Sequence, residues 1–390
     1  MSPWKIKEDI IFIGVRHWDR RLFDELIPLP DGTSYNSYLV LGTEKVALID
    51  TADPSRREEF FRQLEQTGAK RIDYVISNHA EQDHSGLIPD VLEAFPEAKV
   101  VTNEKNKGFL MDLLRIPGDR FMVVADGEEI SLGEKTLKFI FTPWVHWPET
   151  MVTYLKEDKI LFTCDFFGSH LATSDLFADE GTVCESAKRY YAEIMMPFRG
   201  VISRNIEKIR AYDFDIIAPS HGPLYKNPEF IIKAYEDWIS DRVEKVVLVP
   251  YVSMHGSTRV MVEYFVGYLM GKGVKVIPFN LAVTDIGKLA IELVDAAAVV
   301  LGSPTVLTGL HPSAVYALYL LNALRPKTRF LSIIGSYGWG GKAVDVAKSL
   351  LGNLKAELLE PVLIKGYPTE EAFGKLKKLA DNIISRFDTL

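Results

Sequence analysis

Hydrophobic residues in the first 240 positions occur in short runs that polar and turn-forming segments separate. The runs expected to form strands are residues 37–42, 46–50, 74–78, 99–102, 136–141 and 160–164. Helical patterns lie between them, of which residues 55–66 are an example. This mixture of short strands and helices indicates a mixed α+β or layered-sheet architecture for the first part.

The pattern changes near residue 240 into a strict alternation of apolar strands and amphipathic helices. Near-continuous apolar runs occupy residues 245–252, 274–281, 297–305, 329–339 and 359–366. A helical pattern follows each run, the last one beginning at Thr369. Such strand–helix units predict a doubly wound parallel sheet, whose strands are apolar because helices cover both faces. We therefore expect two domains, residues 1–243 and 244–390.

Composition narrows the classes of partner and compartment. The 390-residue chain has 45 basic and 53 acidic residues, a net charge of −8, which argues against nucleic acid or an anionic membrane as main partner. It has two cysteines and no CxxC pair, so neither a disulfide framework nor a four-cysteine metal site is expected. No signal peptide or membrane-spanning run is recognisable. We expect a soluble, cytoplasmic protein.

The densest chemistry lies in the segment His-Ala-Glu-Gln-Asp-His, residues 79–84, which directly follows an expected strand. In an extended segment alternate side chains point the same way, so His79, Glu81 and Asp83 are expected to converge next to His84. A solvated polar loop is the alternative for so short a motif. Two imidazoles and two carboxylates within six residues favour a metal site.

Further candidate ligands follow other expected strands. His146, Asp165 and His221 each come shortly after an apolar run. Taken singly, they have ordinary explanations as a core histidine, a helix cap and a turn residue. Their shared position at strand ends favours a common metal site on loops held by a rigid scaffold. His170 lies five residues beyond Asp165 and is a candidate for supporting the ligands from behind.

In the second part, loops after the first, third and fourth strands carry the candidate binding residues. The first loop has short hydroxyl side chains and a glycine before a helix, which suit a phosphate dianion, although an ordinary capped helix would look alike. It lacks the lysine of a GxxxxGK[ST] phosphate loop, and no GxGxxG follows the strand. The candidate residues are Ser253, Met254, His255, Gly256, Ser257, Thr258, Ser303, Pro304, Thr305, Ser336, Tyr337, Gly338, Trp339 and Gly340.

These motifs together resemble the flavodiiron proteins. The segment from His79 to His84, with His146, Asp165 and His221, is similar to the metal site of the metallo-β-lactamase fold, and Asp50 fits that fold's supporting aspartate. Hydrolases of the fold have histidine where this chain has Glu81. The loops of the second part resemble the FMN-binding loops of flavodoxins. The resemblance implies an αββα sandwich followed by a flavodoxin-like domain.

The resemblance also implies an activity: reduction of dioxygen to water or of nitric oxide to nitrous oxide, with FMN and two iron ions. The seven implied metal ligands are His79, Glu81, Asp83, His84, His146, Asp165 and His221, with Asp165 bridging. A carboxylate at position 81 suits iron that cycles between ferrous and ferric, because harder anionic ligands stabilise the higher state. Tyr337 or Trp339 is expected to stack on the flavin.

The same resemblance implies partners. An external donor such as rubredoxin is expected, because no CxxC module follows the flavodoxin-like part, and a homodimer or homotetramer is implied. Val252 and His255 depart from the aspartate and tryptophan common in the family, without removing a phosphate donor. Two alternatives stay open: a metal-dependent hydrolase with an attached flavin domain, and a non-catalytic electron-transfer or interaction module.

Overall fold

The computed structural model describes residues 3–390, which divide into two compact units. The first comprises residues 3–191 and 198–239, and the second comprises residues 192–197 and 240–390. No helix among the described residues is long and apolar enough to cross a membrane.

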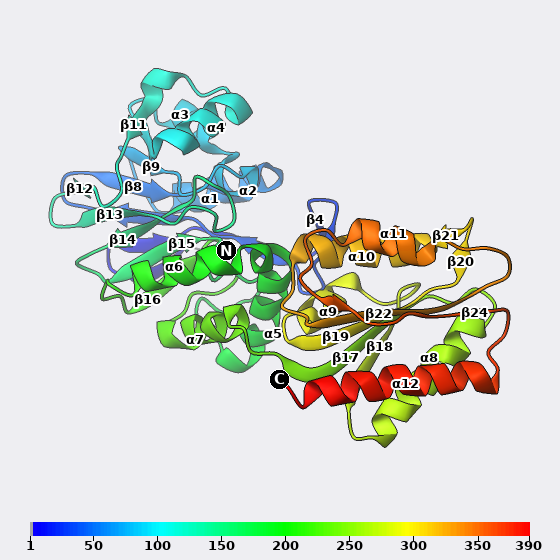
Figure 1. Cartoon of the computed structure of the whole chain (residues 1–390). Coiled ribbons are helices and arrows are strands. Elements are labelled where there is room, and N and C mark those ends of the chain that lie inside the picture. Colours follow the sequence, from blue (N-terminus) through cyan, green and yellow to red (C-terminus); the bar gives the residue numbers. More distant parts are fainter. Residues whose placement is uncertain (1–2) are drawn as a thin grey trace. The chain divides into compact units, whose positions relative to one another are not determined.

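Two sheets form the centre of the first unit (Figure 1). The larger has the order β1 (Trp4–Lys7), β2 (Ile10–Phe12), β7 (Tyr38–Leu41), β8 (Val46–Ile49), β9 (Tyr74–Ile76), β10 (Lys99–Thr102) and β11 (Phe121–Val123). The smaller has the order β12 (Glu129–Ser131), β13 (Thr136–Phe141), β14 (Met151–Leu155), β15 (Ile160–Cys164) and β16 (Ile216–Pro219).

Alternation along the strands builds two cores on opposite faces of the larger sheet. Tyr38 and Val40 face the smaller sheet, where they pack with Phe139 and Phe162. Leu39, between them in β7, faces the opposite way into a core formed with α1 (Arg57–Gln66), α3 (Ile88–Ala94) and α4 (Glu104–Leu114). On the smaller sheet's side lie α5 (Glu180–Tyr190), α6 (Arg199–Ile209) and α7 (Pro228–Ile239). The predicted αββα sandwich is confirmed.

The second unit is a parallel sheet with strand order β18 (Lys275–Asn280), β17 (Glu244–Tyr251), β19 (Ala296–Gly302), β22 (Phe330–Tyr337) and then β23 (Glu357–Leu358) and β24 (Val362–Lys365). This is the flavodoxin-like order, so the predicted doubly wound sheet is confirmed. The last expected strand is interrupted between β23 and β24, where Pro361 has no N–H to donate to a neighbouring strand.

Helices cover both faces of this sheet, as the apolar strands require. Residues of α8 (Ser257–Gly271) and α12 (Glu370–Phe387) form one core with Val247 and Val249 of β17. Residues of α10 (Pro312–Leu324) and α11 (Ala343–Leu350) form the other with Leu301 and Ile333. The remaining helix, α9 (Ile286–Leu293), follows β18. Loops after β17, β19 and β22 consequently meet at one edge of the sheet.

Candidate metal centre and flavin cavity

The metal-ligand candidates lie at the carboxyl ends of strands in both sheets of the first unit. β8 and β9 are parallel neighbours, and β13 and β15 run in the same direction because each is antiparallel to β14. Their carboxyl ends therefore lie at a common edge of each sheet. The residues that follow these ends are Asp50 after β8, His79 after β9, His146 after β13, Asp165 after β15 and His221 after β16.

The seven candidate side chains form two groups, and the buried Cys164 joins His84 and Asp165 in a third group that overlaps both. Within each group the possible ligand atoms lie within 4.8 Å of one another. One group contains His79, Glu81, His146 and Asp165, and the other contains Asp83, His84 and His221. This division follows the one that the family resemblance implies for two irons.

Asp165 faces both groups through its two oxygens. Its Oδ2 lies 3.4 Å from His79 Nε2 and 3.3 Å from His146 Nε2. Its Oδ1 lies 2.9 Å from His84 Nε2 and 3.4 Å from His221 Nε2. A carboxylate with one oxygen directed at each set of imidazoles has the geometry of a bridging ligand between two metal ions.

The expected extended conformation of residues 79–84 is wrong beyond Glu81. Residues Gln82–Ser85 form the short helix α2, which begins after Glu81. The helical turn directs Asp83 away from the side chain of Glu81, so the two carboxylates serve different groups. Glu81 Oε2 lies 3.1 Å from His79 Nε2, whereas Asp83 Oδ2 lies 3.1 Å from His221 Nε2.

The donor atoms fit metal ions. Both carboxyl oxygens of Asp83 and Asp165 and the Nε2 of His84 are buried without a hydrogen-bond partner, despite their short mutual distances. Burial opposes charge on His84, but Asp83 and Asp165 raise its pKa to about 10. Protonated His84 therefore places a positive charge next to the carboxylates of Asp83 and Asp165. Metal cations would neutralise the same carboxylates and would also bind the lone pairs that have no hydrogen-bond partner.

A buried carboxyl group that the sequence patterns did not single out orients the first ligand. Glu149 Oε1 lies 2.6 Å from Nδ1 of His79 and accepts a hydrogen bond from the backbone N–H of Ala80 at 3.1 Å. In the second group, Nδ1 of His221 lies 2.7 Å from the backbone carbonyl of Ser34. Both contacts leave Nε2 free to face the cluster, as in the carboxylate–histidine pairs of metal sites. The only sequence feature that could have identified Glu149 is its position three residues after His146.

The supporting residues named from the sequence act indirectly. Asp50 accepts hydrogen bonds at 2.9 Å from both the backbone and the side-chain amide of Asn78, and so fixes the residue before His79. His170 belongs to neither group; its Nδ1 lies 2.9 Å from Thr33 Oγ1, and its ring packs 4.8 Å from that of His221. Burial, and then His221, hold the pKa of His170 well below its usual value. The imidazole is therefore neutral.

The cluster opens on one side. Side-chain exposure is 16% for Glu81 and 15% for His146, but at most 4% for the other five candidate ligands. Asp24, which follows β4 (Leu22–Phe23), lies close enough that burial and the charges of Glu81 and Asp83 raise its pKa to about 6. A small molecule would reach the cluster from the side of Glu81 and His146.

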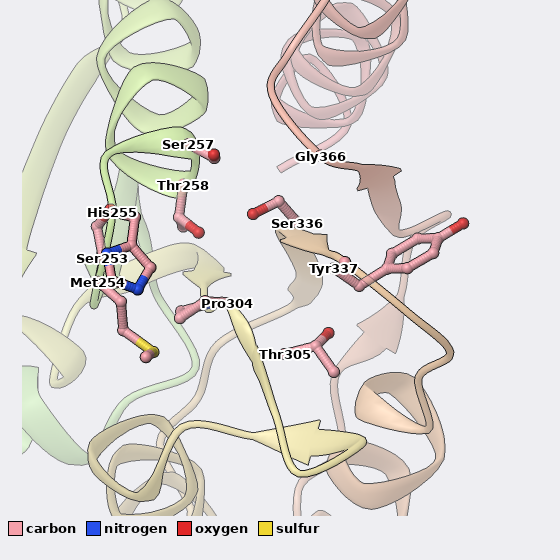
Figure 2. Close-up of a pocket in the computed structure, with 11 residues that line it drawn as sticks. Ser253, Met254, His255, Ser257, Thr258, Pro304, Thr305, Ser336, Tyr337 and Gly366 are labelled. Carbon is pink, nitrogen blue, oxygen red and sulfur yellow. The ribbon is translucent and has the colours of Figure 1, made fainter.

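The second unit has a cavity of about 250 Å³ at the carboxyl ends of its strands. Figure 2 shows the hydroxyl groups of Thr258 and Ser336 directed toward one another across it. Thr258 is 1% exposed and its hydroxyl has no hydrogen-bond partner, which fits a missing anionic acceptor at the start of α8. The lining residues are Ser253, Met254, His255, Ser257, Thr258, Pro304, Thr305, Ser336, Tyr337, Gly338 and Gly366.

Four of the residues expected to contact the flavin do not line this cavity, and Tyr337 lines it without directing its ring into it. The hydroxyl of Ser303 accepts a hydrogen bond from the backbone of His311, and Ser303 does not line the cavity. The ring of Tyr337 points away from the cavity in Figure 2, and Trp339 is 69% exposed and outside the lining. Gly256 and Gly340 are also outside it, although Gly256, with φ of 92°, forms the turn into α8. Gly366, after β24, was missed because no polar side chain marks it.

Comparisons with known proteins agree with this architecture. Residues 33–222 match the family model described as ODP family beta lactamase. A nitric oxide reductase of Moorella thermoacetica is 34% identical over 395 residues, covering 99% of each chain. This chain belongs to the flavodiiron family.

Solved structures of flavodiiron proteins share the whole fold. Rubredoxin oxygen:oxidoreductase from Desulfovibrio gigas superposes with a TM-score of 0.95 at 28% identity, covering 100% of this chain and 99% of the other. The flavodiiron protein from Giardia intestinalis gives 0.92 at 28% identity, with coverage of 99% and 97%. The resemblance inferred from the motifs is confirmed over essentially the full length.

Proposed function

We propose that this flavodiiron protein is an oxidoreductase that reduces dioxygen to water, nitric oxide to nitrous oxide, or both. The observation that carries the proposal is the pair of ligand groups that share Asp165, with Glu81 where hydrolases of the fold have histidine. When bound, the two irons would bind and reduce the gas, and FMN would supply the electrons.

In this proposal the residues divide between two domains, residues 1–243 for the diiron centre and 244–390 for FMN. His79, Glu81 and His146 would hold one iron, Asp83, His84 and His221 would hold the other, and Asp165 would be shared by both. Glu149 orients His79, and the backbone of Ser34 orients His221. Thr258, Ser257 and Ser336 supply hydroxyl groups for the flavin phosphate and its neighbourhood.

The donor and the assembly belong to the proposal too. Rubredoxin or a similar small carrier would deliver the electrons in the cytoplasm. A homodimer or homotetramer would allow the flavin of one subunit to serve the diiron centre of another. A single monodisperse monomer that retained full turnover would contradict the shared arrangement.

The first test is rapid mixing of the fully reduced, iron- and FMN-loaded protein with dioxygen or nitric oxide, while flavin reoxidation is followed. Fast reoxidation by either gas is expected, and the faster gas identifies the preferred substrate. The Glu81→His variant provides the control, because it restores the hydrolase-like ligand set and should slow both reactions. If neither gas reoxidises the wild-type flavin rapidly, the oxidoreductase is refuted and the hydrolase becomes the better reading.

A further inference from the structure

The loop that contains His221 is bound by a segment from the other sheet of the first unit. We call residues 219–222 the His221 loop; it begins at the last residue of β16. Its partner segment, residues 34–38, runs from β6 (Thr33–Tyr35) into β7. The hydrogen-bonded residues of the two segments lie 181 to 188 positions apart in the chain, so their contacts depend on the packing of the two sheets.

Asn36 lies at the centre of these contacts. Its side-chain nitrogen donates hydrogen bonds to the backbone carbonyls of Pro219 and Gly222, both at 2.7 Å. Its backbone N–H donates to the carbonyl of Ser220 at 2.8 Å. One fully buried residue therefore binds three of the four backbone carbonyls of the His221 loop.

Ser34 adds two contacts from the same segment. Its hydroxyl accepts a hydrogen bond from the backbone N–H of Gly222 at 2.7 Å. Its carbonyl lies 2.7 Å from Nδ1 of His221, whose Nε2 lies 3.1 Å from Asp83 Oδ2. The segment that fixes the backbone of the loop thus also orients the imidazole, so the direction of Nε2 depends on both.

The side-chain amide of Asn36 matters for its nitrogen. Its Oδ1 is buried and has no hydrogen-bond partner, which opposes burial of this side chain. The NH2 group offsets that cost because it supplies two N–H donors without a charge, one for each carbonyl. A carboxylate at position 36 would place an acceptor against two acceptors. The arrangement is therefore specific for a side chain that bridges both ends of the loop.

We propose that Asn36 is a positioning residue for the iron site that contains His221. By fixing the backbone from Pro219 to Gly222, it keeps Nε2 of His221 directed at Asp83 and Asp165. This inference rests on the proposed function, in which the two ligand groups hold iron. Asn36 itself contacts no candidate ligand side chain through these bonds, and it acts only through the loop.

Asn106 provides a matched comparison behind the other iron site. It is also fully buried with an unpartnered Oδ1, and its side-chain nitrogen donates to the carbonyl of Ser77 at 3.0 Å and the hydroxyl of Thr102 at 2.7 Å. Ser77 in turn donates through its hydroxyl to the carbonyl of His79 at 3.0 Å. Replacing Asn106 therefore removes similar buried hydrogen bonds on the side of His79.

The experiment compares Asn36→Ala and Asn106→Ala with wild-type protein in anaerobic competition for ferrous ion with a chelator. Mössbauer spectra distinguish the two irons. Asn36→Ala should weaken iron binding at the His221 site by roughly tenfold or more and leave the His79 site within about twofold. Asn106→Ala should leave the His221 site within about twofold. Urea unfolding of metal-free protein should show both variants destabilised, which separates general stability from iron affinity.

Ser34→Ala is the milder test if Asn36→Ala does not fold. It removes the acceptor of the Gly222 N–H but keeps the carbonyl that orients His221, and it should weaken the same site in the same direction.

Wild-type affinity at the His221 site in both Asn36→Ala and Ser34→Ala would overturn the positioning role, as would equal weakening of both sites by Asn36→Ala. A wild-type protein that binds no iron would refute this inference together with the proposed function. A wild-type protein that binds two irons but reduces neither gas would refute the proposed function alone.

Discussion

Replacing Glu149 tests whether a buried carboxyl group behind His79 sets the affinity of one metal ion and spares the other. Glu149 Oε1 lies 2.6 Å from His79 Nδ1, and both side chains are fully buried. Loss of such an orienting partner weakens metal binding by roughly 10–100-fold, or about 1.4–2.7 kcal/mol. Glu149→Gln keeps one acceptor oxygen for His79, so it should weaken metal binding by an amount near the lower limit of this range.

Glu149→Leu removes the acceptor completely, so it should weaken metal binding by an amount near the upper limit of this range. It also leaves the backbone N–H of Ala80 without its partner, which should lower the free energy of unfolding by about 1–3 kcal/mol. The second group is expected to keep its affinity, because its His221 is oriented by a backbone carbonyl that neither substitution removes. The substitutions should therefore lower the affinity for iron at the site that contains His79 and leave the affinity at the site that contains His221 unchanged.

The assay is anaerobic competition for ferrous ion between the protein and a chelator, with Mössbauer spectra to distinguish the two irons. Glu157→Gln is the control, because that carboxyl also accepts a backbone N–H, from Thr136 at 2.7 Å, but belongs to neither ligand group. Wild-type affinity at both sites in Glu149→Leu, or equal weakening of both, would refute the reasoning.

Three further substitutions have distinct expected outcomes. Thr258→Val should weaken FMN binding by roughly 10–100-fold in a fluorescence titration, without lowering the stability of the flavin-free protein, since its hydroxyl is buried and unpartnered. Gly335→Ala should lower the free energy of unfolding by about 1–3 kcal/mol in urea, because a Cβ would meet the Ser303 carbonyl oxygen at 2.0 Å; Gly338→Ala, with open space, should not. The pKa of Asp24 is raised from 3.8 to about 6, so in metal-free protein this carboxyl group binds a proton more readily in the folded state than in the unfolded state. Its contribution to the stability of the folded protein is therefore lost as the pH rises through about 6. Asp24→Asn should thus raise the Tm of metal-free protein at pH 7.5 by roughly 1–3 °C, an effect that iron loading should reduce by offsetting the neighbouring carboxylates.

The fold class followed from the sequence because apolar periodicity reports local geometry. The alternation in β7 of Tyr38 and Val40 with Leu39 already separates two faces, and each face has its own core in the structure. The long apolar runs of β17, β19 and β22 likewise require helices on both sides, which are present. Periods of two and of 3.6 residues are properties of the chain itself, so they can be read without coordinates.

The types of ligand residue and their positions at strand ends could also be predicted from the sequence, but the way in which they group around the two metal positions could not. A single helical turn at Gln82–Ser85 sends Asp83 to a different group from Glu81, and no periodicity of six residues reveals such a turn. Glu149 and Thr33 meet His79 and His170 across 70 and 137 positions of chain, where sequence spacing carries no information. The turned ring of Tyr337 and the buried hydroxyl of Ser303 were decided in the same way.

The sequence by itself therefore determined which elements form and which chemical groups stand at their ends. Only the tertiary structure decided which of those groups meet, because side-chain contacts across the cluster depend on strand order and on the packing of two sheets.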